Sequence, residues 1–433
     1  MKGRPQMEIR DPIHGSIALS DPEVALCDSA PYQRLRAIKQ LGFSEFSFPG
    51  ATHNRFLHSI GVAHLTGRAF DTIFKNYKFS TVEKRNDLRQ AVRMAALLHD
   101  IGHGPLSHAT EEVMPKVGAL NIKAYANKKK PVDPNRQADH EDYTIKFVTD
   151  SSITKVLEEA GVSPFHISCL IDKELIVEDD FFKDHGLNFR TILSQIVSSE
   201  MDCDRMDYLG RDAYYCGTNY GKVELEWLMN HLTYHVENDD VFLALNRRAL
   251  YTFDDFLLSR HHMHLMVYFH HKAIIYEEMM HRYLKSPDCT FSLPSDIEEY
   301  VHCTDMALFQ HLNQVNNPWA KRISERKPYK VLFELHSTEP NPRVSKMKLA
   351  LQDDDVSCIL ANSTARLSKY HASSEVDKAL PIFVVDPYDK RAKPYRIEEQ
   401  TEIFQKYEEI RRIERLYVAP EDLEKSKKII DSL

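Results

Sequence analysis

The sequence predicts a mainly α-helical protein, in which a helical core (residues 1–285) precedes a smaller α+β region (residues 286–433). Three observations support this fold class. The 433 residues include only 14 glycines. Apolar residues recur at helical spacing through much of residues 15–285. After about residue 285, short β-type runs alternate with helical patterns.

The clearest helix of the core has Leu88, Val92 and Leu98 on one apolar face and leads directly into His99. Two glycines follow and end the helix. Pro105 is suited to the first turn of a further helix, which we therefore expect there.

Residues 120–139 are polar and contain prolines, which predicts an exposed loop. In the C-terminal region, 330–335 and 381–385 have the composition of strands. Apolar residues from Ile403 to Ile413 have helical spacing and predict a helix.

Composition excludes several classes of protein. The net charge of −8 argues against a chain-wide surface for nucleic acid or anionic membrane, although a local basic patch for nucleic acid is left open. The seven cysteines are odd in number and form no close pair, which favours a reducing compartment. The first residues contain no apolar leader, and no run is long enough to span a bilayer. We expect a cytoplasmic protein without membrane association.

Two histidines and two aspartates suit one divalent cation with positions left for water and substrate: His58, His99, Asp100 and Asp204. Adjacent residues on a helix point about 100° apart, so His99 and Asp100 reach one ion only where the helix ends. His58 and Asp204 lie on two other apolar segments, and the ion would hold three helices together. The alternative is that His99 and Asp100 form a helix C-terminal pair without a ligand role.

Five strings in the chain resemble the HD-domain superfamily of phosphohydrolases, and within it the deoxynucleoside triphosphate (dNTP) triphosphohydrolase branch. The strings occupy residues 11–15, 32–42, 48–59, 99–108 and 204–212, in family order. The resemblance covers residues 8–280 and implies an HD-domain helical core. It also implies that the four residues above bind the metal and that a dNTP is hydrolysed at the α-phosphorus to a deoxynucleoside and triphosphate.

Acid–base residues are expected beside the metal. His108 and Glu111 are three residues apart and share a helical face, so Glu111 can orient and charge the imidazole. By resemblance, His140 occupies another catalytic position, and His103 lies in the glycine-flanked turn, where it can meet phosphate. The alternative for these histidines is an ordinary surface or capping role.

A triphosphate requires fixed cations, and guanidinium groups bind phosphate through paired hydrogen bonds. Arg55 lies three residues before a predicted metal ligand, Arg205 directly follows Asp204, and Arg260 matches a phosphate-contacting arginine of the family. The alternative for each arginine is a surface ion pair. His271 stands where the family usually has lysine, which puts one phosphate contact in doubt.

The sugar pocket is assigned by resemblance. Tyr208 and Asp212 continue the four-residue spacing of Asp204 and approach the sugar. Further substrate-binding positions are Gln40 near the 3′-hydroxyl, His264, and Tyr268, which crowds the 2′ position and favours deoxyribose. The alternative is that Tyr208 and Tyr268 are core aromatics.

The resemblance also implies one divalent metal ion (Mn, Mg, Fe, Ni or Zn), with room for a second Mg beside the triphosphate. It implies a homo-oligomer, dimer or tetramer. Asp28, Gln33 and Arg36 match part of the family's nucleotide-activator site, whereas Met7 and Arg10 depart from it. Nucleotide activation is therefore a weaker hypothesis than oligomerisation.

Two other functions compete with dNTP triphosphohydrolysis. An HD enzyme could act on another phosphate compound, such as a cyclic nucleotide, a nucleoside monophosphate or an alarmone. A non-catalytic nucleotide sensor or nucleic-acid-binding module would bind without turnover. The complete ligand set and the acidic net charge count against the sensor.

Overall fold

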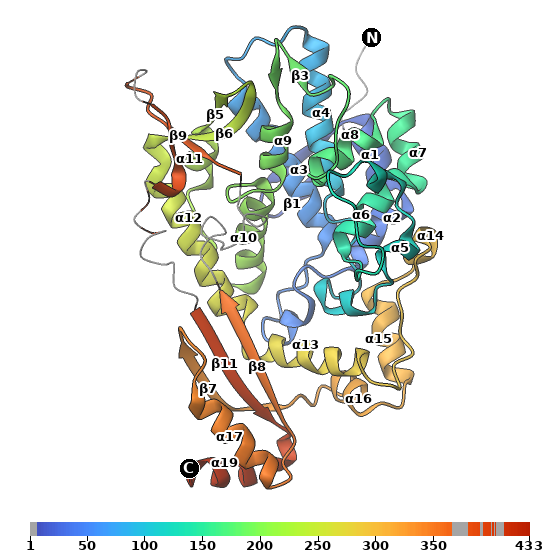
Figure 1. Ribbon diagram of the computed structural model, residues 1–433, viewed down its shortest axis with the longest axis vertical. Helices are drawn as coiled ribbons and strands as arrows, with labels where there is room; N and C mark the ends of the chain where they lie inside the picture. Colours follow the sequence, from blue (N-terminus) through green and yellow to red (C-terminus); the bar gives the residue numbers. More distant parts are fainter. Residues whose placement is uncertain (1–6, 366–379, 390–392, 400, 402, 404–410) are drawn as a thin grey trace.

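The computed structural model describes residues 7–365, 380–389, 393–399, 401, 403 and 411–433. Figure 1 shows a large helical body above a small three-stranded sheet that carries two helices on its outer side. The mainly α class with a C-terminal α+β region is confirmed.

The helices of the body, in chain order, are α1 (Asp21–Asp28), α2 (Ala30–Arg34), α3 (Arg55–Ile73), α4 (Val82–Leu98), α5 (Val117–Leu120), α6 (His140–Thr149), α7 (Ser152–Glu159), α8 (Pro164–Ile171), α9 (Arg190–Val197), α10 (Cys203–Cys216), α11 (Leu225–Asn230), α12 (Leu250–Met263), α13 (His271–Leu284), α14 (Ile297–Tyr300), α15 (Asp305–Gln314) and α16 (Pro318–Ser324). The C-terminal helices are α17 (Pro342–Asp353) and α19 (Leu423–Asp431).

The strands are β1 (Met7–Asp11), β2 (Gly15–Leu19), β3 (Lys183–Asp184), β4 (Leu187–Asn188), β5 (Leu232–Glu237), β6 (Asp240–Asn246), β7 (Lys330–Ser337), β8 (Cys358–Ala365), β9 (Phe383–Val385), β10 (Tyr395–Arg396) and β11 (Arg411–Val418). Strands β1 and β2 form an antiparallel hairpin, and β10-β9-β6-β4-β3 form a mixed sheet to which β5 adds by pairing with β6.

Three helices form the centre of the body. The side chains of Asn54 and Thr81 cap the N-termini of α3 and α4, which pack side by side, and α10 packs against α3. The expected apolar face of α4 is confirmed, since Leu88, Val92 and Leu98 are fully buried. These three helices therefore give the site a rigid frame.

The turn after α4 differs from the expectation. Residues 104–107 form a non-helical turn in which Leu106 and Ser107 have positive φ, and the next element is a 3₁₀ helix, His108–Val113. The α-helix predicted to begin at Pro105 is therefore wrong. The turn is held by tertiary hydrogen bonds, because Leu106 N donates to Asp305 Oδ1 (2.7 Å) and Ser107 Oγ donates to the carbonyl of Lys39 (2.8 Å).

About half of the residues in 120–139 are exposed, as expected of a loop, and the region contains a short 3₁₀ turn, Lys123–Asn127. The strands predicted at 330–335 and 381–385 are observed as β7 and β9. The helix predicted from Ile403 to Ile413 is wrong at Ile413, which lies in strand β11. Residues 404–410 lie outside the described residues.

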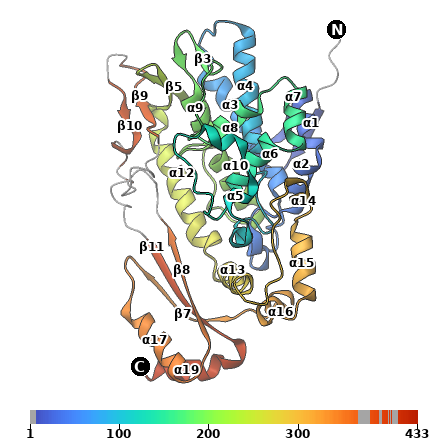
Figure 2. The same cartoon turned by 45° about the vertical axis from the view of Figure 1, so that its right-hand side comes forward.

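The C-terminal strands belong to two different sheets. Strand β11 is the central strand of the antiparallel sheet β7-β11-β8, at the lower end of the molecule in Figures 1 and 2. Strand β9 instead pairs in parallel with β6, and the amide of Gln195 donates to the carbonyl of Pro381 (2.9 Å). Residues 381–385 thus pack on the helical body, whereas β11 belongs to the C-terminal sheet.

The boundary at residue 285 stays a prediction. Leu293, Ile297 and Tyr300 lie beyond it and are buried in the same apolar core as α3 and α4. Across the described part of the chain, no helix is both long enough and apolar enough to cross a bilayer.

Helix α3 approaches α10 at a glycine. A methyl group at Gly61 would collide with the buried side chains of Asp207 and Arg211, whereas one at Gly210, within α10, would meet nothing within 4 Å. We expect Gly61→Ala to lower the free energy of unfolding by about 1–3 kcal/mol through overpacking. The matched change Gly210→Ala should raise it by about 0.5–1 kcal/mol, because alanine favours the helix. Urea denaturation followed by circular dichroism measures both, and equal effects would contradict the close approach.

Candidate metal centre and active-site cavity

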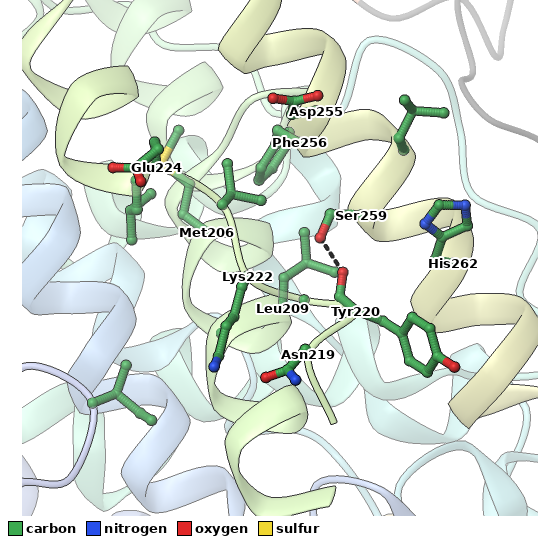
Figure 3. Close-up of a pocket in the computed structure, with 16 residues that line it drawn as sticks. Met206, Leu209, Asn219, Tyr220, Lys222, Glu224, Asp255, Phe256, Ser259 and His262 are labelled. Atoms are coloured by element: carbon green, nitrogen blue, oxygen red, sulfur yellow. Dashed lines mark hydrogen bonds between the residues drawn. The ribbon is translucent and has the colours of Figure 1, made fainter. Parts of the chain in front are cut away.

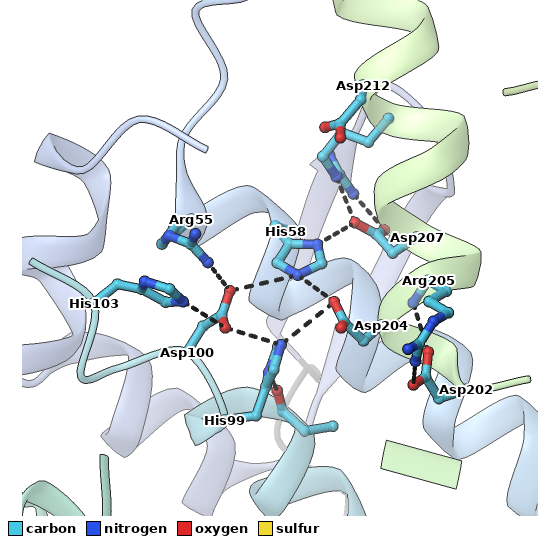
Figure 4. A network of polar contacts seen from close by, with 12 residues as sticks. Arg55, His58, His99, Asp100, His103, Asp202, Asp204, Arg205, Asp207 and Asp212 are labelled. Atoms are coloured by element: carbon cyan, nitrogen blue, oxygen red, sulfur yellow. Dashed lines mark hydrogen bonds and ion pairs between the residues drawn. The ribbon is translucent and has the colours of Figure 1, made fainter. Parts of the chain in front are cut away.

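Four side chains from three helices converge at the centre of the body (Figure 4). His58 extends from the first turn of α3, His99 and Asp100 follow the last residue of α4, and Asp204 lies in the first turn of α10. His58 Nε2 lies 3.0 Å from Asp204 Oδ1 and 3.6 Å from Asp100 Oδ2. His99 Nε2 lies 3.4 Å from Asp100 Oδ1 and 3.7 Å from Asp204 Oδ1. The helix end at His99 is what lets both neighbours face one point.

This donor set fits a divalent cation. His58, His99 and Asp204 each offer one ligand atom within 4.8 Å of the others. The Nε2 atoms of both histidines are buried and have no hydrogen-bond partner within the described residues. Two unpartnered imidazole nitrogens facing two carboxylates match the ligand preference of Zn, Fe, Mn and Ni. The cluster can therefore hold a metal, and its chemistry leaves the identity of that metal open.

The electrostatics of the cluster favour positive charge. Burial opposes protonation of His58, but the carboxylates of Asp204 and Asp207 raise its pKa to about 10. Burial also opposes ionisation of Asp100, yet Arg55 and His99 hold its pKa well below the usual range. The carboxylates thus stay charged and draw a cation to the imidazoles.

A residue outside the predicted set orients His58. Asp207 is fully buried, and its Oδ2 lies 2.8 Å from His58 Nδ1. The carboxylate also accepts from Arg211 Nε (2.8 Å) and bonds His14 Nε2 (2.6 Å). On the other imidazole, His99 Nδ1 bonds the carbonyl of Ala96 (2.7 Å). These contacts direct both Nε2 atoms to the cluster, as outer-shell partners of metal-bound histidines do.

A second group of titratable side chains adjoins the cluster. Glu111 Oε1 lies 3.0 Å from His108 Nδ1 and 2.5 Å from His140 Nδ1. The rings of His103 and His140 stack with centroids 3.8 Å apart. His103 Nε2 lies 3.3 Å from Asp100 Oδ1, which joins this group to the metal cluster.

Glycine lets α6 bring His140 to this group. A side chain at Gly102 would collide with the backbone of His140 and Thr144. Gly102 N donates to Thr144 Oγ1 (3.0 Å), and Thr144 Oγ1 donates to the carbonyl of His99 (3.2 Å). The turn after α4 and the start of α6 are thereby fixed to each other.

The two groups prefer different protonation states. Burial would raise the pKa of Glu111, but hydrogen bonds from His108 and His140 lower it to about 2. Burial disfavours the charged form of His140, yet its hydrogen bond with Glu111 raises the pKa. Burial and then the charge of Arg55 lower the pKa of His103. The buried imidazole of His103 is therefore neutral, whereas the imidazole of His140, stacked on it, accepts a proton readily.

A cavity of about 740 Å³ opens onto both groups. It is lined by most of the residues that the sequence predicts, namely Gln40, Arg55, Asp100, His103, His108, His140, Asp204, Tyr208, Asp212, His264 and Tyr268. Glu111, His58 and His99 lie behind this wall in contact with it. Arg55 is held in the wall by an ion pair with Asp100 and by donation from its Nε to Ser107 Oγ (3.0 Å).

The sugar-side residues form their own chain of contacts. Tyr268 hydroxyl donates to Asp212 Oδ2 (2.8 Å), and His53 Nε2 lies 2.7 Å from Asp212 Oδ1. The rings of Tyr208 and Tyr268 are 6.3 Å apart in an edge-to-face arrangement. His53, which the sequence analysis did not select, thus holds Asp212, a residue predicted to bind the substrate.

Arg205 and Arg260 are placed differently from Arg55. Neither lines the cavity, and each is engaged by a carboxylate: Arg205 by Asp202, and Arg260 by Glu200 (3.0 Å). Their roles as phosphate contacts stay predictions.

A second large cavity, of about 760 Å³, lies on the other side of α10, between α12 and residues 219–225 (Figure 3). Its floor includes Met206, Leu209 and Phe256, and Ser259 Oγ bonds the carbonyl of Tyr220 across it. No residue predicted as a site residue is among the described residues that line it. Helix α10 therefore presents its polar stripe to one cavity and its apolar stripe to the other.

Comparisons with known proteins agree with this architecture. The family models described as HD domain and HD associated region match residues 55–159 and 225–357. The chain is 29% identical to an uncharacterized protein of Methanocaldococcus jannaschii over 77% of this chain and 61% of that one. It is 27% identical to deoxynucleoside triphosphate triphosphohydrolase SAMHD1 of Homo sapiens over 78% of this chain and 56% of that one. It thus spans little more than half the length of these curated relatives.

The fold has a solved counterpart as well. The crystal structure of a hypothetical protein from Aquifex aeolicus matches with a TM-score of 0.74 at 24% identity, covering 98% of this chain and 100% of that one. A helical core with a His–Asp cluster where α3, α4 and α10 meet defines the class. Residues 55–159 match the HD domain, and the chain is similar to the HD-domain superfamily.

The metal cluster makes a direct prediction. Asp204→Asn should abolish stoichiometric binding of divalent metal, because it removes the charge that faces both His58 and His99. Asp207→Asn should retain the metal with an affinity about 10–100-fold weaker, since it disturbs the contacts that orient His58 but removes none of the four ligands. Metal content after loading and desalting, measured by inductively coupled plasma mass spectrometry, checks both.

The control is His166→Ala, which removes an imidazole paired with exposed Asp179 (2.7 Å) outside the cluster. It should bind metal as the parent does. The same metal content in Asp204→Asn and His166→Ala would show that the cluster is not the metal site.

Proposed function

We propose that the protein is a metal-dependent dNTP triphosphohydrolase that converts a dNTP and water into a deoxynucleoside and triphosphate. The observation that carries the proposal is that one cavity joins the His–Asp cluster, the His108–Glu111–His140 group and the tyrosine–carboxylate pair of Tyr268 and Asp212. In this proposal the three groups serve one substrate as metal site, proton donor system and polar wall facing the sugar.

The residues of the metal cluster have a defined task in this reaction. His58, His99, Asp100 and Asp204 would hold a divalent metal, which would supply Lewis-acid polarisation of phosphate and lower the pKa of bound water. Arg55, fixed by Asp100 and Ser107, adds a guanidinium in the same wall. A fixed cation in a cavity wall stabilises the charge that develops on phosphate oxygens.

The proton balance assigns a role to the second group. Water attacks the α-phosphorus and gives up one proton to the solvent, the bond from phosphorus to O5′ breaks, and O5′ must gain a proton to leave as the deoxynucleoside. His108 lines the cavity and bonds Glu111, which also raises the pKa of His140. This group is suited to deliver that proton, and the neutral His103 beside Asp100 is suited to accept a hydrogen bond instead.

The sugar wall supports a deoxyribonucleotide. Tyr268 is held rigidly by Asp212, and Asp212 is held by His53. A fixed ring can exclude an added hydroxyl by packing, which an adaptable apolar wall does poorly. The SAMHD1 relative of Homo sapiens, whose name carries this activity, gives independent support. Homo-oligomerisation and nucleotide activation stay predictions.

The reaction class has a direct test. Metal-supplemented protein incubated with each of the four dNTPs should release deoxynucleoside and inorganic triphosphate in equal amounts, resolved by ion-exchange chromatography. GTP should be turned over far more slowly. Release of pyrophosphate or orthophosphate would contradict the proposed bond cleavage. If no dNTP were turned over, with or without a second nucleotide, the substrate would be another phosphoester and the proposed function would be wrong.

The acid group predicts a pH effect. His108→Ala should keep its metal and lose about 10²-fold in kcat, the scale of a general acid.

In Glu111→Gln the hydrogen bond that raises the pKa of His140 loses its charge, so the imidazole deprotonates at lower pH. His140 belongs to the group that delivers the proton, so activity that needs protonated His140 is then lost earlier as pH rises. The alkaline limb of the kcat profile should therefore move to lower pH. An unmoved alkaline limb would remove Glu111 from this role.

A further inference from the structure

A third cavity lies away from the metal cluster, where β2 meets α3 and α4. Its volume is about 270 Å³. Three arginines, one histidine, two serines, a glutamine, an alanine and one glutamate line it: Arg68, Arg89, Arg93, His64, Ser16, Ser20, Gln90, Ala18 and Glu23. Positive side chains outnumber the negative one by three to one in its wall.

The single carboxylate is fully neutralised. Glu23 is buried and forms a paired ion bridge with Arg93, with Nε to Oε1 at 2.6 Å and Nη2 to Oε2 at 2.9 Å. It also accepts from the backbone N–H of Ser20 (2.9 Å). The remaining donors of Arg93 reach the carbonyls of Ala63 and Ala18. This pair is structural and leaves Arg68 and Arg89 as the cationic face of the cavity.

Arg68 and Arg89 are held from outside by exposed carboxylates. Glu226 takes both Nη atoms of Arg68 (2.8 and 2.6 Å), and Asp71 takes Nε and Nη2 of Arg89 (3.0 and 2.7 Å). Within the described residues, Arg68 Nε and Arg89 Nη1 make no hydrogen bond. Exposed ion pairs of this kind contribute little free energy, so an anion that enters the cavity can compete with Glu226 and Asp71 for these two guanidinium groups.

His64 reports the potential inside the cavity. Burial first, and then the charges of His14, Arg68 and Arg93, lower the pKa of its imidazole to about 4. No hydrogen bond satisfies its ring nitrogens within the described residues. The cavity therefore offers a neutral imidazole whose ring contacts His14 but makes no hydrogen bond within the described residues, beside two guanidinium groups, which is a surface suited to a tetrahedral oxyanion.

We propose that this cavity, defined by Arg68, Arg89, His64 and Ser20, is a binding site for a phosphate-bearing anion, distinct from the metal-site cavity. Its volume accommodates a phosphate or pyrophosphate group. Free inorganic phosphate compounds and the phosphate of a mononucleotide share this chemistry. The site does not depend on the proposed function, because its residues take no part in the metal cluster.

The test is isothermal titration calorimetry of the full-length protein with pyrophosphate in a phosphate-free buffer. Arg89→Gln should weaken one set of sites by at least about tenfold, because it removes a charge-assisted donor from the cavity. The matched control is Arg85→Gln. Arg85 pairs with the same Asp71 but does not line the cavity, and in each variant the other arginine still holds Asp71. Arg85→Gln should bind as the parent does.

Equal binding by the two variants, or a single set of sites that Arg55→Gln abolishes, would overturn the proposal, since binding would then belong to the metal-site cavity. His64→Ala gives a second check and should weaken the same set of sites as Arg89→Gln. Repeating the titration with orthophosphate and adenosine monophosphate distinguishes the sources: tighter binding of the nucleotide identifies a nucleotide phosphate, and tighter binding of orthophosphate or pyrophosphate identifies the free ion.

Discussion

The buried carboxylate of Asp207 is the contact on which the site depends. It meets His14 from the β1–β2 turn, His58 from α3 and Arg211 from α10, and Arg211 in turn bonds Asp11 (2.7 Å). Burial opposes ionisation of Asp207, but Arg211 and its other partners hold its pKa well below the usual range. A charge of this kind is costly to bury and stable only while all its partners remain. The hairpin, α3 and α10 are therefore fixed together, and His58 Nε2 is directed to the metal cluster.

The turn after α4 joins the chain beyond residue 285 to this centre. Asp305, at the start of α15, accepts from Leu106 N and Lys39 N (2.7 and 2.9 Å), and burial raises its pKa to about 6. Positive φ at Leu106 and Ser107 costs free energy that these bonds offset. The strained turn places His103 beside Asp100 and brings His108 against His103, with ring centroids 4.8 Å apart. Residues of the HD-associated region thus support the geometry of the HD domain without lining the metal cluster.

The sequence predicts what local patterns determine. The apolar face of α4 and the β-rich run of β7 are decided by neighbours in the chain, and both are observed. Strand β11 was misjudged because residues 413–418 are buried on both faces of the sheet, so its apolar residues lack the alternation of a half-exposed strand. The role of Asp207 was missed because Asp202, Asp204 and Asp207 look alike in sequence. Only the way in which α10 crosses α3 in the structure distinguishes Asp204, which faces the metal cluster, from Asp207, which orients His58.

Helices α3 and α4 connect the metal cluster with the arginine-lined cavity. His58 and His64 are six residues apart on α3, as are Arg93 and His99 at the end of α4, which corresponds to about 9 Å of helix rise in each case. Side chains between these positions are almost entirely buried, so the two helices move as packed bodies rather than by bending. An anion that draws Arg68 and Arg89 together would act on the angle between α3 and α4. A second link runs outside this helix pair, because the ring of His64 lies 5.6 Å from that of His14, and His14 bonds Asp207, which orients His58.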